Sequence, residues 1–145
     1  MEVKMPTRRF SFATLVSLIL VSCSDRGNVV STLIQDPTWQ LESIESGDST
    51  TSIPANEVYT LHFDNDSLVS GRVHCNTYFT NYCIVPPDSI SFGPFNATKM
   101  GCPQPSNQLE FRRGFDNTNA IDITSNRLRL YYLNRTRVLN FGKVR

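Results

Sequence analysis

Short runs of alternating apolar and polar residues are the feature of this sequence that most restricts its fold. In the run 58–63, Tyr59, Leu61 and Phe63 alternate with other residues, and the turn-forming stretch 64–66 follows. Similar runs recur along the chain at 38–43, 67–75, 78–85, 89–93, 120–124, 127–133 and 137–141. Because successive side chains of a strand point to opposite faces, this pattern is typical of half-buried antiparallel strands. A length of 145 residues allows one such domain.

One segment, 106–115, departs from this alternation. Phe111 and Phe115 lie four residues apart and would therefore share one face of a helix. Asn107, followed three residues later by Glu110, matches the pattern of a capping box at a helix start. The sequence therefore predicts an α+β chain that is mostly β, with one short helix that packs its phenylalanines on the sheet.

The first 22 residues have the pattern of a leader for export. Basic residues precede an uncharged stretch at 10–22, whose 13 residues would span about 20 Å as a helix, less than the roughly 30 Å of a membrane core. This length is typical of the apolar part of a secretory signal. Cys23 ends the sequence LVSC, which resembles the lipobox of bacterial lipoproteins, where the cysteine receives a lipid. We therefore expect a signal peptide at 1–22, acylation of Cys23, a polar tether at 23–35 and a folded domain at 36–145.

This leader predicts a location and a partner. Lipid chains on Cys23 would hold a small domain at a membrane without a spanning helix. By resemblance to proteobacterial lipoproteins, Ser24 in place of an aspartate implies the outer over the inner membrane of the cell envelope, and the leaflet stays open because other bacteria sort differently. Removing the leader takes away three of 14 basic and one of 13 acidic residues, which changes the formal net charge from +1 to −1. Since the remaining arginines are scattered among apolar residues, we expect no nucleic-acid partner. We also expect the protein to be a monomer.

The stretch 72–83 holds the densest set of reactive side chains, namely His74, Cys75 and Cys83. A structural zinc site commonly pairs its ligands as C-x₂₋₄-C, whereas Cys75 and Cys83 lie eight positions apart. Adjacent residues of a strand point to opposite faces, which opposes both a metal site and a catalytic pair at His74 and Cys75. We therefore expect no metal, no cofactor and no enzymatic activity. In an oxidising compartment a disulfide is favoured, and acylation of Cys23 would leave three thiols, enough for one bridge and one free thiol.

Several motifs together resemble the META/HslJ domain family. They are TWQLESI near the start of the domain, YTLHFDNDSLVSGRVHCNTYFTNY in the middle, SFGPFNATKMGCP after it, and a closing LRLYY and VLNF. The likeness covers nearly all of 36–144, and the positions that carry it include Cys75, Asn76, Thr98, Met100, Cys102 and Glu110. The resemblance implies a small antiparallel β-barrel-like domain with one short helix. The sequence departs from the family at His74, where a glycine is usual, and at Cys83, which is an extra cysteine.

The resemblance also implies a pairing for the cysteines. Cys75 and Cys102 both belong to the family's motifs, so we expect a disulfide between them and a free thiol at Cys83. The residues alone leave two rival pairings open, Cys75–Cys83 and Cys83–Cys102.

Two functions remain open at this point. The family has no established biochemical activity and is linked loosely to heat response, drug tolerance or virulence. The resemblance therefore implies a non-catalytic envelope lipoprotein that acts in the envelope stress response or in protein interaction. The alternative is a carrier of a small apolar ligand, because aromatic side chains of a β-barrel can line a pocket as well as fill a core. The aromatic residues concerned are Trp39, Tyr59, Phe63, Phe92, Phe111 and Phe115.

Overall fold

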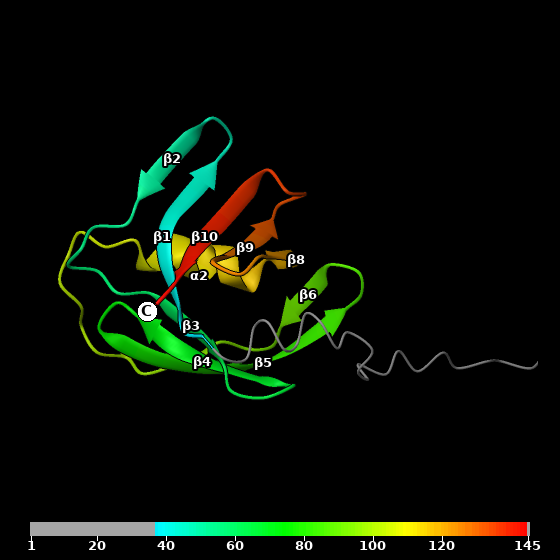
Figure 1. Cartoon of the computed structure of the whole chain (residues 1–145). Coiled ribbons are helices and arrows are strands. Elements are labelled where there is room, and N and C mark those ends of the chain that lie inside the picture. Colours follow the sequence, from blue (N-terminus) through cyan, green and yellow to red (C-terminus); the bar gives the residue numbers. More distant parts are fainter. Residues whose placement is uncertain (1–36, 145) are drawn as a thin grey trace, which may run out of the picture.

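The computed structural model describes residues 37–144, which form a β-barrel with a helix against one side (Figure 1). The expected signal peptide, Cys23 and the tether lie outside these residues. Within 37–144, no helix is long and apolar enough to cross a membrane.

Ten strands and one helix make up the described part of the chain. In chain order they are β1 (Trp39–Ser46), β2 (Ser49–Ser52), β3 (Thr60–Phe63), β4 (Leu68–Val73), β5 (Asn76–Val85), β6 (Ser89–Phe92), β7 (Asn96–Ala97), α2 (Gln108–Asp116), β8 (Thr118–Ile123), β9 (Arg127–Tyr132) and β10 (Arg137–Lys143). The alternating runs of the sequence correspond to β1, β3, β4, β5, β6, β8, β9 and β10, and their ends shift by a few residues.

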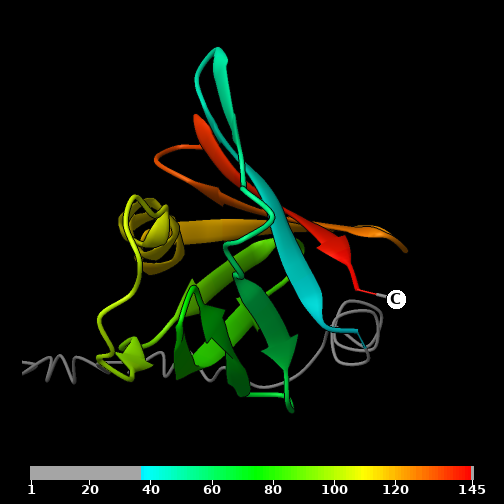
Figure 2. The same cartoon turned by 90° about the vertical axis from the view of Figure 1, so that its left-hand side faces the viewer.

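Eight of these strands form a closed ring of antiparallel pairs. The order around the ring is β1, β10, β9, β8, β6, β5, β4 and β3. Strand β1 closes it, because Trp39 pairs with Lys143 of β10 on one edge and with Leu61 of β3 on the other. Figure 2 shows β1 running from the side of β3 up to the hairpin that it forms with β2. The expectation of a small antiparallel β-barrel with one short helix is confirmed.

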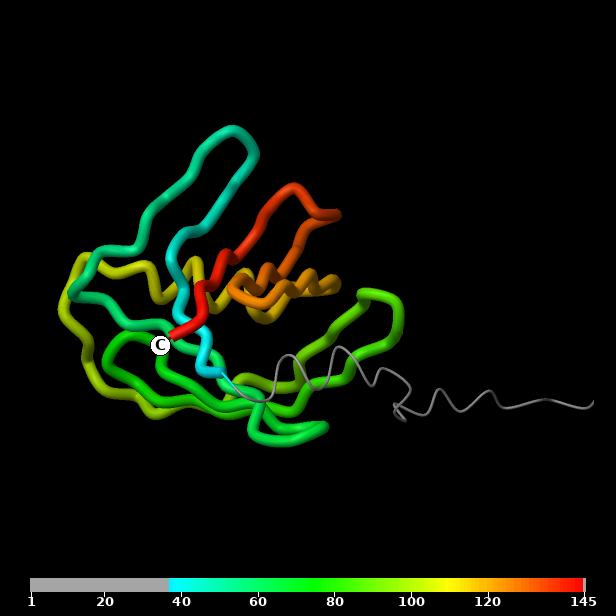
Figure 3. Tube along the Cα trace, viewed as in Figure 1, coloured from blue at the N-terminus to red at the C-terminus, as the bar shows by residue number. Residues whose placement is uncertain are grey.

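Two strands lie outside the predicted runs. Strand β2 exposes all its side chains, so its sequence STTS shows no apolar alternation. It pairs with the end of β1 in a hairpin, whose turn contains Gly47 at a φ of 59°, a left-handed conformation that glycine adopts readily. This β1–β2 hairpin extends beyond the rest of the barrel (Figure 3). Strand β7 has only two residues and pairs with β5.

Large aromatic side chains fill the interior of the barrel. Those that are almost completely buried are Trp39, Tyr59, Phe63, Phe111, Phe115, Tyr132 and Phe141. The ring of Phe92 stacks on that of Phe115, with 4.0 Å between the centroids. The rings of Tyr59 and Phe111 lie 5.2 Å apart. This packing favours a filled core over the ligand pocket that the carrier alternative requires.

Helix α2 packs on the barrel through Phe111 and Phe115, as its spacing predicts. Gly114 lies between them and faces β10. A Cβ atom at this position would come within 2.9 Å of the side chain of Leu139. Glycine is less favourable than alanine in a helix by up to about 1 kcal/mol, and here it allows the helix to approach the sheet closely.

The start of α2 differs from the prediction. The expected capping box is wrong, because the Asn107 side chain makes no capping hydrogen bond to the helix and donates instead to Glu57. Glu110 accepts from Arg113 at 2.9 Å and lies 3.5 Å from Arg137 of β10. Glu110 therefore places a negative charge in the first turn of the helix and also connects the helix to the barrel.

Candidate functional site

Asn76 is the buried centre of a braced loop. It is the first residue of β5 and is 1% exposed. Its Oδ1 accepts hydrogen bonds from Thr98 Oγ1 at 2.9 Å and from the Met100 N–H at 2.7 Å. Its Nδ2 donates to the Met100 carbonyl at 3.1 Å and lies 3.2 Å from Cys102 Sγ. One side chain thus holds three points of the segment 98–102, which we call the 98–102 loop.

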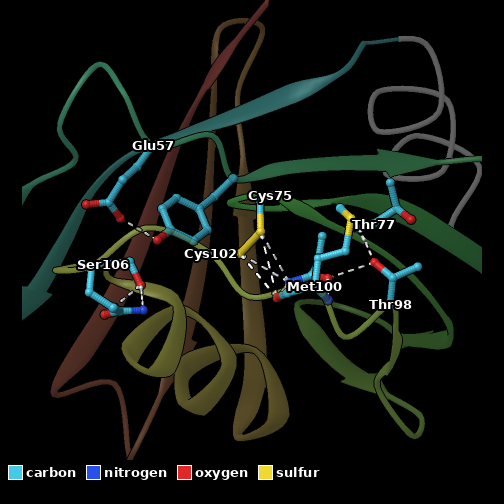
Figure 4. The surroundings of a disulfide bond; sticks show 10 residues. Glu57, Cys75, Thr77, Thr98, Met100, Cys102 and Ser106 are labelled. Atoms are coloured by element: carbon cyan, nitrogen blue, oxygen red, sulfur yellow. Dashed lines mark hydrogen bonds between the residues drawn. A yellow bond between two sulfur atoms is a disulfide. The ribbon is translucent and has the colours of Figure 1, made fainter.

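A disulfide between Cys75 and Cys102 fastens the same loop to the barrel. The two Cα atoms are 5.6 Å apart, and the residues are separated by 27 positions in the sequence. This is the pairing that the resemblance implied, so neither cysteine is bonded to Cys83. In Figure 4 the disulfide lies between Thr98 on one side and Glu57 on the other.

Thr98 adds a backbone connection between the loop and β5. Its N–H donates to the Thr77 carbonyl at 3.0 Å, and its hydroxyl accepts from the Thr77 N–H at 3.1 Å. The motif residues between Cys75 and Cys102 therefore meet in one cluster around Asn76. Glu110 is the exception, since its recorded partners lie on α2 and β10.

His74 occupies the turn that leads into the disulfide. Its φ of 56° lies in the left-handed region, which explains why a glycine is usual at this position. The His74 N–H donates to the Val58 carbonyl at 2.7 Å, so the bend is kept in spite of the larger side chain. The imidazole is 8% exposed and stacks on Tyr59 with 6.3 Å between ring centroids. Its Nε2 is buried without a hydrogen-bond partner among the described residues.

Glu57 is the centre of a second buried polar cluster on the other side of the disulfide. It is 4% exposed and accepts hydrogen bonds from the Tyr59 hydroxyl and from the Asn107 backbone N–H, the latter at 2.8 Å. The Asn107 amide donates to both carboxylate oxygens at 3.3 Å. Because Asn107 directly precedes α2, Glu57 adds a second negative charge, beside that of Glu110, near the helix N-terminus. Sequence reasoning missed Glu57, since 50 positions separate it from Asn107 and no local pattern marks it.

These hydrogen bonds set the protonation of the cluster. Burial raises the pKa of Glu57, but the hydrogen bonds from Asn107 and Tyr59, together with the nearby His74, outweigh burial and hold the pKa below its ordinary value of 4.5. Burial and the adjacent carboxylate raise the pKa of Tyr59. At neutral pH Glu57 is therefore ionised and Tyr59 is neutral, as suits a structural hydrogen bond more than a proton transfer.

Two open hollows adjoin along the 98–102 loop and α2, and we call them together the loop–helix groove. One, of about 710 Å³, extends from β7 to the helix, and the other, of about 460 Å³, continues past Cys102. The residues that line both are Met100, Gly101, Gln108 and Arg112. Met100 is 58% exposed, and Leu109, at the second hollow, is 60% exposed. The braced loop and the helix thus present apolar side chains to the solvent on either side of this groove.

The expectation of a free thiol at Cys83 is wrong. Cys83 is disulfide-bonded, and the described residues contain no free cysteine. The expectation followed from the predicted acylation of Cys23, which would leave three thiols for one bridge. Cys23 itself lies outside the residues that the structure describes.

The two histidines lie in different surroundings. His62 Nε2 is 3.9 Å from Asp64, whereas His74 stacks on Tyr59. Between residues 37 and 144, no group of three or more His, Cys, Asp or Glu side chains could hold a metal ion. The candidate functional site is the loop–helix groove, because the motif residues Asn76, Thr98 and Met100 line its first hollow.

Comparisons with known proteins agree with the motifs and the fold. A family model described as META domain matches residues 32–145. The NMR structure of a protein from Burkholderia xenovorans is similar with a TM-score of 0.64 and 20% sequence identity, over 97% of this chain and 99% of that chain. The crystal structure of a DUF4847 family protein from Bacteroides vulgatus gives a TM-score of 0.58 and 16% identity, over 78% of this chain and 96% of that chain. No curated protein matches the sequence.

The two solved structures, at these identities, show the fold alone. The family model goes further, because it covers most of the chain and includes the whole cluster around Asn76 and the disulfide. The chain belongs to the META domain family.

Proposed function

We propose that this chain is a non-catalytic binding protein of the bacterial cell envelope, held at a membrane by lipid on Cys23, where it contacts a protein partner through the loop–helix groove. A role in the response to envelope stress is part of this proposal. The support for the location is the leader and the LVSC motif, and Ser24 favours the outer membrane.

The observation that supports the binding role is that buried groups hold in place a loop whose apolar side chain, Met100, is exposed. Asn76, which is 1% exposed, and the Cys75–Cys102 disulfide hold a loop whose Met100 is 58% exposed. A single exposed apolar residue is common in soluble proteins, but a rigid loop that presents one beside a groove is typical of a recognition surface. Rigidity also favours binding, because less conformational freedom is lost when a partner docks.

The buried ionisable groups also favour binding over catalysis. The Glu57 carboxylate is ionised and already accepts hydrogen bonds from Tyr59 and Asn107. Cys75 and Cys102 are joined to each other. These groups support the shape of the groove, which is consistent with a protein that works by contact.

The location is tested by labelling cells with a radioactive fatty acid. The intact chain should carry the label and fractionate with the outer membrane, and the Cys23→Ala variant should carry none. An unlabelled protein in the soluble fraction, or peptide mapping that joins the Cys83 and Cys23 peptides, would remove the lipid anchor from the proposal, because a cysteine in a disulfide cannot carry the lipid.

The binding role is tested by photocrosslinking in cells that express the full chain. A photoreactive phenylalanine analogue replaces Leu109 in the groove, and in a matched control it replaces Leu133, which is 51% exposed in the turn after β9. We expect a discrete protein adduct from position 109 that disappears when Met100→Asp is added. The same adducts from both positions, or adducts that Met100→Asp leaves unchanged, would argue against the groove as the contact.

A further inference from the structure

We infer that the groove accepts an extended acidic polypeptide segment that carries an apolar side chain. This inference rests on the proposed function and specifies the partner's chemistry at the same site.

The charge of the groove is one-sided. Among the described residues that line its two hollows, Lys99 and Arg112 are basic and none is acidic. The Arg112 guanidinium lies 5.4 Å from the centre of the Phe95 ring, which holds it against the wall of the groove. Arg112 also lies 3.4 Å from Asp116, but this pair is largely exposed and Asp116 does not line either hollow. A partner that brings carboxylates would therefore complement this surface.

The apolar side chains lie within reach of the same charges. Met100 lines both hollows together with Arg112, and Leu109 lines the second. Methionine is unbranched and flexible, so it can adapt its shape to an apolar side chain of a partner. The groove thus presents apolar and basic side chains within a few residues of each other. A complementary partner would carry an apolar and an acidic side chain close together.

The edge of β7 favours an extended partner. Asn96 and Ala97 pair with β5, at Phe79 and Tyr78, and both line the first hollow; among the described strands β7 pairs with β5 alone. Such an edge can accept an extended segment as an additional strand. A flat anionic membrane fits this surface less well, because the groove is concave and lipid-binding clusters commonly need four to eight basic residues.

The test uses the acylated full chain, purified in mild detergent, to select from random dodecapeptides displayed on phage. We expect the selected peptides to combine Asp or Glu with a large apolar residue. Arg112→Gln should weaken their binding about fivefold or more in low salt, and Arg112→Lys should restore most of it. Arg113→Gln is the matched control, since the Arg113 side chain is 60% exposed against 55% for Arg112, has its own ion pair and does not line either hollow. Leu109→Ser should weaken binding about tenfold and Leu133→Ser should not.

Each other result overturns the inference. Basic or neutral peptides, no selected peptides, or binding that does not change in Arg112→Gln would exclude an acidic segment. Vesicles of phosphatidylglycerol that bind through Arg112 would assign the surface to lipid, and dimers that Leu109→Ser dissociates would assign it to a second copy. If the in-cell adduct at position 109 is found on a segment without acidic residues, the partner's chemistry is wrong while the proposed binding role stands.

Discussion

The 98–102 loop and the β1–β2 hairpin both leave the barrel, but they are built in different ways. The loop is held by the buried Asn76 side chain and by a disulfide, and it exposes Met100. The hairpin is held by backbone pairing of β1 with β2 and with β10, and all side chains of β2 are polar and exposed. Buried side-chain groups, namely Asn76 and the disulfide, thus hold the 98–102 loop, whereas the side chains of β2 make no buried contact of this kind. This difference is the physical basis of our proposal that the loop, and not β2, contacts a partner.

Removing the disulfide should have the largest effect on stability. Closing the loop between Cys75 and Cys102 stabilises the fold by up to about 3.6 kcal/mol in the chain-entropy description. The double variant Cys75→Ser with Cys102→Ser should therefore unfold at a clearly lower urea concentration. An unchanged urea midpoint in the double variant would show that the bridge does not brace the loop.

Replacing Asn76 should cost nearly as much. Asn76→Ala removes the partners of the Thr98 hydroxyl and of both backbone groups of Met100, and we expect a loss of about 2 to 3 kcal/mol in the free energy of unfolding. Asn140→Ala is a matched control, because the Asn140 amide donates to the side chains of Ser43 and Glu45 near the surface. This control should cost about 0.5 to 1 kcal/mol. Equal losses in the two variants would mean that Asn76 has no special bracing role.

Glu57→Gln should have a moderate and pH-dependent effect. The folded-state pKa of Glu57 is below its ordinary value of 4.5, so ionised Glu57 stabilises the fold above that pH. This contribution is lost as the pH falls through the lower, folded-state value. We expect Glu57→Gln to cost about 1 kcal/mol at neutral pH and the difference from the unsubstituted chain to vanish in acid. Urea unfolding across this pH range measures it, and a difference that grows in acid would reverse the assigned sign.

Substitution in the hairpin should have the smallest effect. Thr50 of β2 is exposed, so Thr50→Ala should change the free energy of unfolding by less than about 0.5 kcal/mol. It should also leave the adduct at position 109 unchanged, because no residue of β2 lines the loop–helix groove. Loss of that adduct in Thr50→Ala would place the functional surface on the hairpin instead.

The sequence predicts the barrel strands well because burial on one face leaves a period of two residues. Leu128, Leu130 and Tyr132 of β9 are buried in alternation, and the same residues alternate in the sequence. Strand β2 was not predictable in this way, since a strand with both faces exposed has no apolar period. The role of Gly114 in the helix was not predictable either, because it depends on close packing against Leu139, which lies in a strand distant in the sequence.

The candidate site was only partly predictable. The motif residues from Cys75 to Cys102 came from the family resemblance, and the structure explains them as parts of one brace. Glu57 gave no signal, because its partner Asn107 is remote in the sequence. Local reasoning therefore read Asn107 as a cap for its own helix. The groove could not be found from the sequence at all, since it depends on how α2 and β7 lie around the loop.

The most direct test of the account is the hydrogen-exchange rate of the Met100 amide in the folded protein. That N–H donates to the buried Asn76 Oδ1 at 2.7 Å, so it should exchange more slowly than the amides of Ser49–Ser52 in the hairpin. In Asn76→Ala its exchange should accelerate to the rate of the hairpin amides. If the Met100 amide of the unsubstituted chain already exchanges as fast as those of β2, the loop is not braced, and the groove that depends on it is not a preformed binding surface.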